Sequence, residues 1–308
     1  MSGQLVPWDD ARIHIGSHVV HYGSAVFEGV RCYKTPKGSA VFRLDAHTER
    51  LFNSAKIYWM DLRWTPEQVN DAILQTIAAN KLEACYIRPI VYRGEGQLGV
   101  NPLGSPVELA IMVWDWGKYL GKEALEQGVD VCVSSWTRLA PNTLPAMAKS
   151  AANYMNSQLI KVEAVKGGFV EGIALDAQGF VSEGSGENVF AVSKGRLITP
   201  PLVSSVLPGI TRDTVIALAQ RLGIPVEEKA LPRELLYLAD ELFFTGTAAE
   251  ITPIRSVDRQ KIGSGSRGPV TAALQKAFFD VVDCKVGDEH GWLTFVPALA
   301  GAVSGGAR

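Results

Sequence analysis

A glycine-marked segment separates this chain into two parts, and each part alternates between strand-like and helix-like stretches. Residues 117–128 contain three glycines with mixed polarity between them, which is typical of a connecting loop. The chain has 308 residues and 47% hydrophobic content, enough for one large domain or two smaller ones, each with its own core. We therefore expect an α/β protein of the α+β type, with a small domain at 1–117, an interdomain loop at 118–128 and a large domain at 129–308.

The small domain contains a pair of side chains that suits a carboxylate. Residues 1–45 resemble short strands and turns, and helices are expected after Asp45 and over 65–80. Alternating polarity predicts a strand over 86–92, so Tyr86 and Arg88, two positions apart, project from the same face. A phenol beside a guanidinium is a good carboxylate receptor. A half-exposed strand face would explain the pair equally well.

One lysine, Lys149, lies among small residues and follows two prolines. A desolvated lysine changes its pKa readily and suits Schiff-base chemistry. If a helix begins near Ser150, Tyr154 lies about one turn further on and faces the same cavity. On these residues alone, an exposed lysine at the start of a helix is the more common arrangement.

The large domain contains three segments that could receive an anion. The glycine-rich turn at 183–188 lets backbone approach a ligand. A helix is expected from Thr211, and the amides at its start suit a phosphate. The polar turn at 245–250 offers hydroxyls and amides. A pyridoxal phosphate site needs such a seat, together with a lysine, a carboxylate such as Glu183 and a group that binds the substrate carboxylate.

Composition argues against several other classes of protein. The net charge is -2 with both signs scattered, so we expect neither nucleic acid nor a membrane surface as a partner. No apolar stretch reaches spanning length, and residues 1–10 do not resemble a signal peptide. The four cysteines are far apart, which favours reduced core residues in a cytoplasmic protein. The five histidines form no ligand pair with them, so no metal site is expected.

Three blocks of sequence resemble the signature of the class IV aminotransferases, the pyridoxal phosphate enzymes of fold type IV. These blocks are Glu183-Gly-Ser-Gly-Glu-Asn-Val-Phe190, Leu197-Ile-Thr199 and Leu207-Pro-Gly-Ile-Thr-Arg212. Within the class, the chain is similar to branched-chain amino acid aminotransferases from about Trp8 to Trp292. The segments that support this likeness are 21–29, 86–89, 99–102, 140–143 and 246–253.

The resemblance implies transamination of L-leucine, L-isoleucine and L-valine with 2-oxoglutarate, using pyridoxal 5′-phosphate. Lys149 matches the lysine that bonds to the cofactor and carries the proton. Glu183 matches the carboxylate at the pyridine nitrogen, and Tyr154 the phenol at the 3′-oxygen. The other positions expected to bind the cofactor are Arg50, Gly186, Ile210, Thr211 and Thr247.

For the substrate, the resemblance implies that Tyr86 and the Thr247-Ala248 turn bind the α-carboxylate. Arg88 matches the arginine that accommodates the second carboxylate of glutamate. In the family, two wall residues come from a neighbouring subunit, which implies a homodimer or a higher homo-oligomer such as a hexamer. The positions that match the pocket wall, with those two at the end, are Phe27, Trp116, Tyr119, Tyr154, Tyr22 and Val100.

Three other functions agree with parts of this pattern. A D-amino acid or (R)-amine transaminase shares the fold, but the Tyr86/Arg88 pair argues against it. An aminodeoxychorismate lyase shares the fold and the lysine, and would release pyruvate. A non-enzymatic binding module would have no need for Lys149, Glu183 and Tyr154 together.

Overall fold

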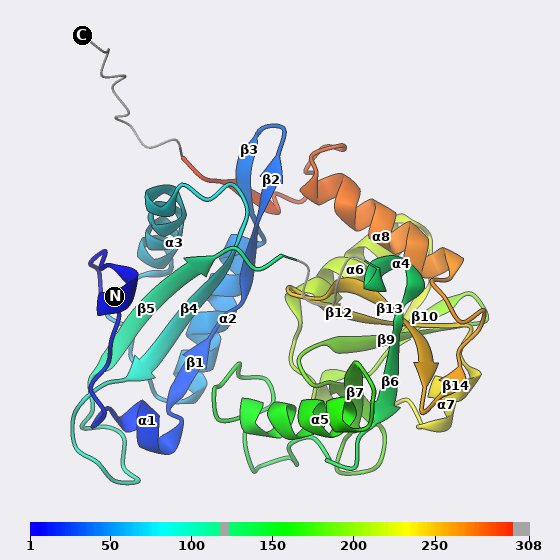
Figure 1. The fold of residues 1–308 in the computed structure, drawn as a ribbon, viewed down its shortest axis with the longest axis horizontal. Coiled ribbons are helices and arrows are strands. Elements are labelled where there is room, and N and C mark those ends of the chain that lie inside the picture. Colours follow the sequence, from blue (N-terminus) through cyan, green and yellow to red (C-terminus); the bar gives the residue numbers. More distant parts are fainter. Residues whose placement is uncertain (118–122, 298–308) are drawn as a thin grey trace.

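The first sheet is antiparallel and is built mostly from the N-terminal part of the chain. The computed structural model describes residues 1–117 and 123–297, and Figure 1 shows two groups of elements side by side. Within these residues the first sheet has six strands in the order β1-β4-β2-β3-β15, and β5 also pairs with β4. Its strands are β1 (Ala25–Phe27), β2 (Val30–Thr35), β3 (Gly38–Phe42), β4 (Cys85–Arg93), β5 (Val107–Trp114) and β15 (Leu293–Phe295).

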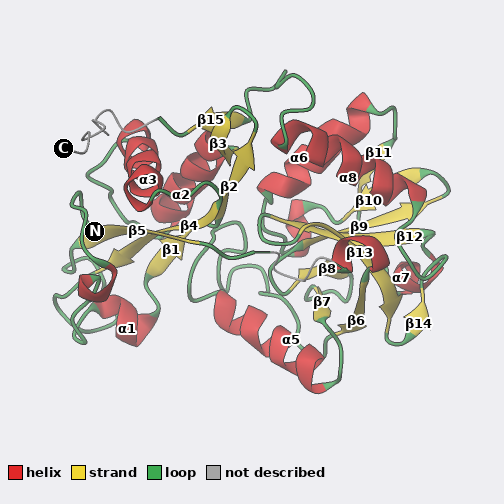
Figure 2. Cartoon of the chain, turned by 45° about the horizontal axis from the view of Figure 1, so that its top comes forward, coloured by secondary structure: helices red, strands yellow, loops and turns green. Residues whose placement is uncertain are grey.

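Two helices cover one face of this sheet, as their apolar spacing predicts (Figure 2). Helices α2 (Leu44–Ile57) and α3 (Pro66–Asn80) bury Leu51, Ile73 and Ile77 against the strands. Helix α3 begins at a capping box that Thr65 and Gln68 form, which satisfies two amides at the helix start. The expectation of only strands and turns over 1–45 is wrong at two short helices, η1 (Trp8–Asp10) and α1 (His18–Tyr22).

The second sheet is mixed and larger. In the described residues it has nine strands in the order β11-β10-β9-β12-β13-β6-β7-β8, with β14 beside β13. The parallel pairs are β10 with β11, β13 with β6 and β6 with β7. Its strands are β6 (Val129–Val133), β7 (Glu171–Leu175), β8 (Val181–Gly184), β9 (Asn188–Ser193), β10 (Arg196–Thr199), β11 (Val226–Glu228), β12 (Glu241–Gly246), β13 (Glu250–Val257) and β14 (Gln260–Lys261).

Helices lie on both sides of the second sheet (Figure 2). Helix α5 packs on β7, while α6 and α8 pack on β12 from the other side. None of the helices in the described residues has the length and apolarity to cross a membrane. The helices of this part are α4 (Ala124–Gln127), α5 (Tyr154–Lys166), η2 (Leu202–Ser204), α6 (Ile210–Arg221), α7 (Glu234–Leu238) and α8 (Pro269–Val282).

Backbone pairing joins the Lys149 segment to the edge of the first sheet. Ser150 forms an isolated bridge with Val26, the Phe27 amide donates to the Lys149 carbonyl at 2.9 Å, and the Ala151 amide donates to Ala25 at 2.9 Å. The prediction of a helix start near Ser150 is therefore wrong, because these extended residues pair with β1. Helix α5 begins only at Tyr154.

The last strand returns to the first sheet. Strand β15 pairs with β3, so the described chain crosses between the two groups of elements a second time. The short helix α4 lies inside the segment 118–128 that we expect to be a loop. The domain boundaries expected at 117 and 129 stay a prediction.

Replacement of Phe243 with Ala should destabilise the protein by about 3–5 kcal/mol, because a large cavity remains in the core. The Phe243 and Phe190 rings are fully buried and stack with centroids 5.1 Å apart. Denaturant unfolding measures the loss. As a control, Leu238→Ala removes a side chain that is 75% exposed and should change the free energy of unfolding by less than about 0.5 kcal/mol. Equal losses in both variants would contradict this description of the core.

Candidate active site

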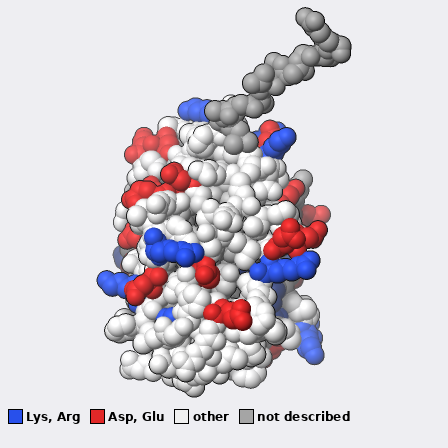
Figure 3. Space-filling view, turned by 90° about the vertical axis from the view of Figure 1, so that its left-hand side faces the viewer, with Lys and Arg blue, Asp and Glu red and all other residues white. Residues whose placement is uncertain are grey.

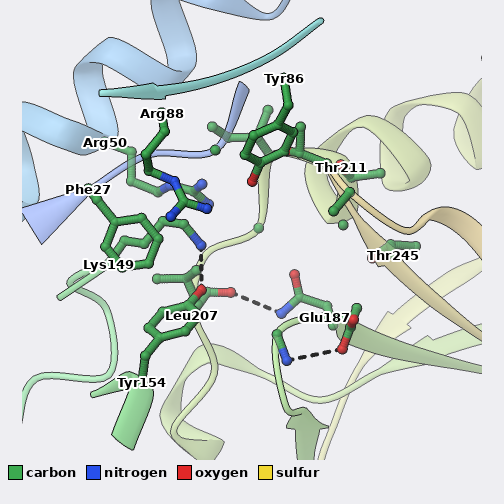
Figure 4. A pocket seen from close by; sticks show the side chains of 18 of the residues that line it. Phe27, Arg50, Tyr86, Arg88, Lys149, Tyr154, Glu187, Leu207, Thr211 and Thr245 are labelled. Carbon is green, nitrogen blue, oxygen red and sulfur yellow. Dashed lines mark hydrogen bonds between the residues drawn. The ribbon is translucent and has the colours of Figure 1, made fainter. Parts of the chain in front are cut away.

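A cavity of about 140 Å³ lies where the two groups of elements meet, and it brings most of the predicted site residues together (Figure 4). A smaller cavity adjoins it, and Glu183, Lys149 and Tyr154 line that one. The predicted residues that line the main cavity are Phe27, Arg50, Tyr86, Arg88, Trp116, Lys149, Tyr154, Gly186, Ile210, Thr211, Thr247 and Ala248.

Three predicted residues are not part of these cavities. Tyr22 and Val100 line neither cavity, and they are 45% and 90% exposed. Tyr119 lies outside the residues that the structure describes. Tyr22 and Val100 therefore do not line the site of their own chain. A role for them in substrate binding requires a second subunit.

The amine of Lys149 points into the cavity beside a phenol and an aromatic ring (Figure 4). Its Nζ lies 2.5 Å from the Tyr154 hydroxyl and 5.0 Å from the centroid of the Phe27 ring. Among the described residues Lys149 has no carboxylate as an ion-pair partner. Lys149 is thus a half-buried nucleophile candidate, and the exposed-lysine interpretation is wrong.

The carboxyl group of Glu183 is buried and held from three directions. It accepts hydrogen bonds from Arg138 Nη2 at 2.6 Å, the Leu207 amide at 3.0 Å and Asn188 Nδ2 at 3.2 Å. Burial raises the pKa of Glu183, although the Arg138 charge and the Leu207 amide oppose that change. The sequence did not single out Arg138, because no local pattern marks it and its partner is 45 residues away.

Arg50 also has a buried carboxylate as its partner, so it is not a solvated surface arginine. Glu28 accepts from Arg50 Nε at 2.6 Å and Nη2 at 2.9 Å, while Arg50 Nη1 donates to the Pro208 carbonyl at 2.9 Å. His47 Nδ1 lies 2.7 Å from the same carboxylate. Burial alone would raise the pKa of Glu28, but the charges of Arg50 and His47 hold it well below its usual range.

The start of α6 and two glycines, Gly29 and Gly209, line the main cavity. The amides of Ile210 and Thr211 lie in the first turn of α6, where they have no partner within the helix. A Cβ on Gly209 would lie 1.8 Å from Asn188 Oδ1, and one on Gly29 would lie 1.9 Å from the Tyr86 hydroxyl. Both positions therefore require glycine. Such a helix start is suited to a phosphate group.

Arg88 is a cation in an aromatic wall without a carboxylate partner. Its guanidinium lies 4.7 Å from the Phe27 ring, 5.5 Å from Tyr86 and 5.9 Å from Trp114. Within residues 1–117 and 123–297 it makes no ion pair, and its buried Nε has no hydrogen-bond partner. Such a group is suited to bind an anion that enters the cavity.

A further carboxyl group lines both cavities and was missed by the sequence analysis. Glu187 is buried, and its Oε2 accepts from the Gly186 amide at 3.0 Å. Burial, with the nearby charge of Glu171, raises the pKa of Glu187 to about 8. The described residues contain no group of three or more His, Cys, Asp or Glu side chains that could hold a metal ion.

A family model described as amino-transferase class IV matches residues 25–257, and this range includes every residue that lines the two cavities. The chain belongs to the class IV aminotransferases. This class IV aminotransferase is 51% identical over 293 residues to the branched-chain-amino-acid aminotransferase of Escherichia coli strain K12, and the match covers 95% of each chain. The resemblance that the three sequence blocks predict is therefore confirmed.

Solved structures agree with this assignment. The crystal structure of the Escherichia coli branched-chain amino acid aminotransferase matches with a TM-score of 0.95 and 51% identity, covering 96% of this chain and 98% of that chain. The T.th. branched-chain amino acid aminotransferase with pyridoxamine 5′-phosphate matches with a TM-score of 0.92 and 44% identity, covering 95% and 96%. The expected fold type IV is thereby confirmed.

Replacement of Arg50 with Met should destabilise the folded protein by about 3–5 kcal/mol at pH 7, because it leaves Glu28 buried without its main partner. The lowered pKa of Glu28 means that its pairing adds stability above the pKa of the unfolded carboxyl group, about 4.3, and that this stability is lost as pH falls. The deficit of the variant should therefore stay constant between pH 7 and pH ~4.3 and shrink as the pH falls further. Urea unfolding across that range measures it.

The matched control removes both partners of this ion pair. The double variant Glu28→Gln with Arg50→Met has no uncompensated charge, so it should be more stable than Arg50→Met alone. If the double variant is less stable than the single one at pH 7, charge compensation is not the role of this pair.

Proposed function

We propose that this protein transfers the amino group of L-leucine, L-isoleucine or L-valine to 2-oxoglutarate, giving branched-chain 2-oxo acids and L-glutamate, with pyridoxal 5′-phosphate as its cofactor. The observation that carries this proposal is the half-buried Lys149 amine, 2.5 Å from the Tyr154 hydroxyl, in a cavity that also contains a helix start suited to phosphate and an arginine without an ion pair in the described residues. The names of the relatives support the same activity and the same cofactor class.

The residues of the cavity fit this cofactor. A phosphate group would be held by the Arg50 guanidinium, the first amides of α6 and the hydroxyls of Thr211 and Thr247. The buried Thr245 hydroxyl has no hydrogen-bond partner among the described residues, which fits a wall that receives a polar ligand. When bound, pyridoxal phosphate supplies an electron-withdrawing ring that stabilises negative charge on the substrate Cα.

Three side chains perform the proton chemistry in this proposal. Lys149 would hold the cofactor, and its Nζ would take the substrate proton and return it. Tyr154 keeps Nζ in place through the hydrogen bond of 2.5 Å. Glu183 would keep the ring nitrogen of the cofactor protonated, and Arg138 and the Leu207 amide keep that carboxyl group oriented. Gly186 lines the smaller cavity together with Glu183, and a glycine there would let the backbone approach the ring.

The pocket must accept an apolar and an acidic side chain in turn. The rings of Phe27 and Trp116 provide an apolar wall for leucine, isoleucine and valine. Arg88, cationic and unpaired within the described residues, would bind the second carboxylate of glutamate and 2-oxoglutarate. Tyr86 and the amides at Thr247 and Ala248 would bind the α-carboxylate that all these substrates share.

We also propose that the protein assembles as a homodimer or a higher homo-oligomer. Tyr22 and Val100 belong to a set of exposed large apolar side chains in the N-terminal part; Figure 3 shows charges of both signs over the upper and middle part of this face and few over its lower part. Such an apolar surface is typical of an interface. All four cysteines are free thiols, which supports a cytoplasmic location. Other exposed apolar residues of the N-terminal part are Leu5, Trp8, Ile13, Ile15, Val20, Leu98 and Leu103.

Replacement of Lys149 with Ala should slow both half-reactions by about 10⁴-fold or more, because the group that carries the proton is removed. The absorption spectrum of the cofactor-loaded protein measures each half: L-leucine should change the band of the wild type, and 2-oxoglutarate should restore it. Lys166→Ala, an exposed lysine of α5, is the control and should react normally. Near-normal turnover of Lys149→Ala would reject the proposal, as would a wild-type protein that responds to D-leucine but not to L-leucine.

Replacement of Arg88 with Leu should separate the two substrates. We expect kcat/KM for glutamate to fall about 10–100-fold, since a charge-assisted hydrogen bond of about 1.5–3 kcal/mol is lost. The value for leucine should stay within about threefold, because its side chain has no use for the cation. Arg88→Lys, which keeps the charge but not the fork, should keep part of the glutamate activity. An equal loss for both substrates would contradict the role of Arg88.

A further inference from the structure

Two of the four cysteines lie directly opposite each other in the first sheet. In the antiparallel pairing of β2 with β4, Cys32 is the partner of Cys85, although the two are far apart in the sequence. Both are free thiols, and both are buried, with exposed fractions of 1% and 5%. They belong to the core that this sheet forms with α2 and α3. The fold thus creates a thiol pair that the spacing of the cysteines along the chain does not reveal.

The backbone holds this pair at a spacing that suits a disulfide. Residues directly opposite each other in an antiparallel ladder have Cα atoms about 4.5–5.5 Å apart, and disulfides span Cα separations of about 4.4–6.8 Å. The side chains of opposite residues also leave the sheet on the same face. A bond between the two sulfur atoms therefore requires changes of side-chain rotamers and little movement of the strands.

The two thiols already interact, and they differ in acidity. A hydrogen bond between them raises the pKa of Cys32, and burial raises it further. The same hydrogen bond lowers the pKa of Cys85, against the effect of burial. The thiolate is the form that reacts with oxidants, so Cys85 is the reactive member and Cys32 the resolving one. Residues 83 and 84 are exposed, which places the Cys85 thiol close to solvent at the start of β4.

The other two cysteines have no such partner in the part of the chain that the structure describes. Cys132 lies on β6 of the second sheet, opposite Gly172, and burial raises its pKa to about 11. Cys284 follows the end of α8 and belongs to no strand. A reaction that joins two thiols of one chain is therefore expected at Cys32 and Cys85.

We propose that Cys32 and Cys85 form a redox modification site, at which a hydroperoxide closes a reversible disulfide between β2 and β4. The Cys85 thiolate attacks a peroxide oxygen and becomes a sulfenic acid, while the O–O bond breaks and hydroxide leaves. The Cys32 sulfur then bonds to the Cys85 sulfur and loses its proton, and water leaves. Two electrons pass from the sulfur atoms to hydrogen peroxide, which ends as two molecules of water.

The bond would form on the face of the sheet that is turned away from the main cavity. Cys32 and Cys85 pack toward the helices, whereas the next pair of the ladder, Arg31 and Tyr86, projects from the other face. Tyr86 lines the main cavity. The disulfide would therefore fix β2 against β4 beside this pair without entering the cavity. Arg31 in turn donates hydrogen bonds to three backbone carbonyls, those of Gly117, Thr247 and Ala248.

We expect the oxidised protein to resist unfolding while it keeps its activity. A disulfide restricts the unfolded chain, and in the chain-entropy account the effect grows with the length of chain between the two cysteines. In a reducing compartment such a bond is transient. The site would therefore stabilise the first sheet during oxidation, and the bond would open again when reducing thiols are restored.

Peptide mapping of the holoenzyme tests the proposal. Reduced protein is treated with hydrogen peroxide, free thiols are blocked with N-ethylmaleimide, and unreduced peptides are identified by mass spectrometry. We expect a linked peptide that joins Cys32 to Cys85 within one chain and disappears after dithiothreitol. The midpoint of thermal unfolding should rise by about 4 °C or more in the oxidised protein, and turnover of L-leucine should stay within about twofold.

Variants separate this pair from the other thiols. Cys85→Ala should form no linked peptide and gain no thermal stability after the same treatment, whereas Cys284→Ser should behave as the wild type. Cys32→Ala leaves Cys85 without a resolving partner, so it should give a sulfenic acid that dimedone labels. The mapping and the unfolding measurements do not depend on a substrate, so they test this site even if the proposed function fails.

Four results would overturn the proposal. These are the absence of the Cys32–Cys85 peptide from folded, peroxide-treated wild type, a link between two chains instead of within one, a link that forms only in urea, and a loss of turnover that dithiothreitol restores. A link within one chain that dithiothreitol reverses, that raises the unfolding midpoint and that is absent from Cys85→Ala would support it.

Discussion

The site depends on the backbone pairing that holds the Lys149 segment against strand β1. Lys149 and Ala151 come from the second part of the chain, but they form backbone hydrogen bonds with Phe27 and Ala25, on either side of the Ser150–Val26 bridge. The lysine is therefore placed at the seam between the two sheets, where each sheet contributes one wall. Backbone hydrogen bonds are directional, and buried backbone groups need partners. This pairing consequently fixes where the amine lies before any ligand is bound.

Around that seam, the buried charges divide into compensated and uncompensated ones. Glu28 is paired with Arg50 and His47, and Glu183 is paired with Arg138. Among the described residues, Lys149 and Arg88 have no such partner and face the cavity. Pairing makes it tolerable to bury a charge that holds another group in position, whereas an unpaired cation in a cavity favours an anionic or electrophilic ligand. The carboxylates of Glu28 and Glu183 are thus neutralised by partners, whereas the cations of Lys149 and Arg88 are left available to a ligand.

Much of the site could be predicted because its residues lie in contiguous motifs. The blocks at 183–190 and 207–212 led to Glu183, Ile210 and Thr211, and the structure brings these to one region. The helix start near Ser150 was predicted wrongly, because helical propensity cannot register a pairing with a strand more than a hundred residues away. Arg138 and Arg31 were not singled out for a similar reason: an isolated arginine carries no local pattern.

By itself, the sequence determined the family, the alternation of strands and helices, and which residue types carry the chemistry, since these follow from periodicity and from motifs read in order along the chain. Only the tertiary structure decided which charges are paired, which are left facing the cavity, and that Arg31 donates hydrogen bonds to the carbonyls of Gly117, Thr247 and Ala248. Those outcomes depend on groups that are distant in sequence: Arg31 and Ala248 are 217 positions apart, and their hydrogen bond exists only because the two sheets pack together. Hydrogen bonds and ion pairs act over a few ångströms, so their partners are chosen by the fold.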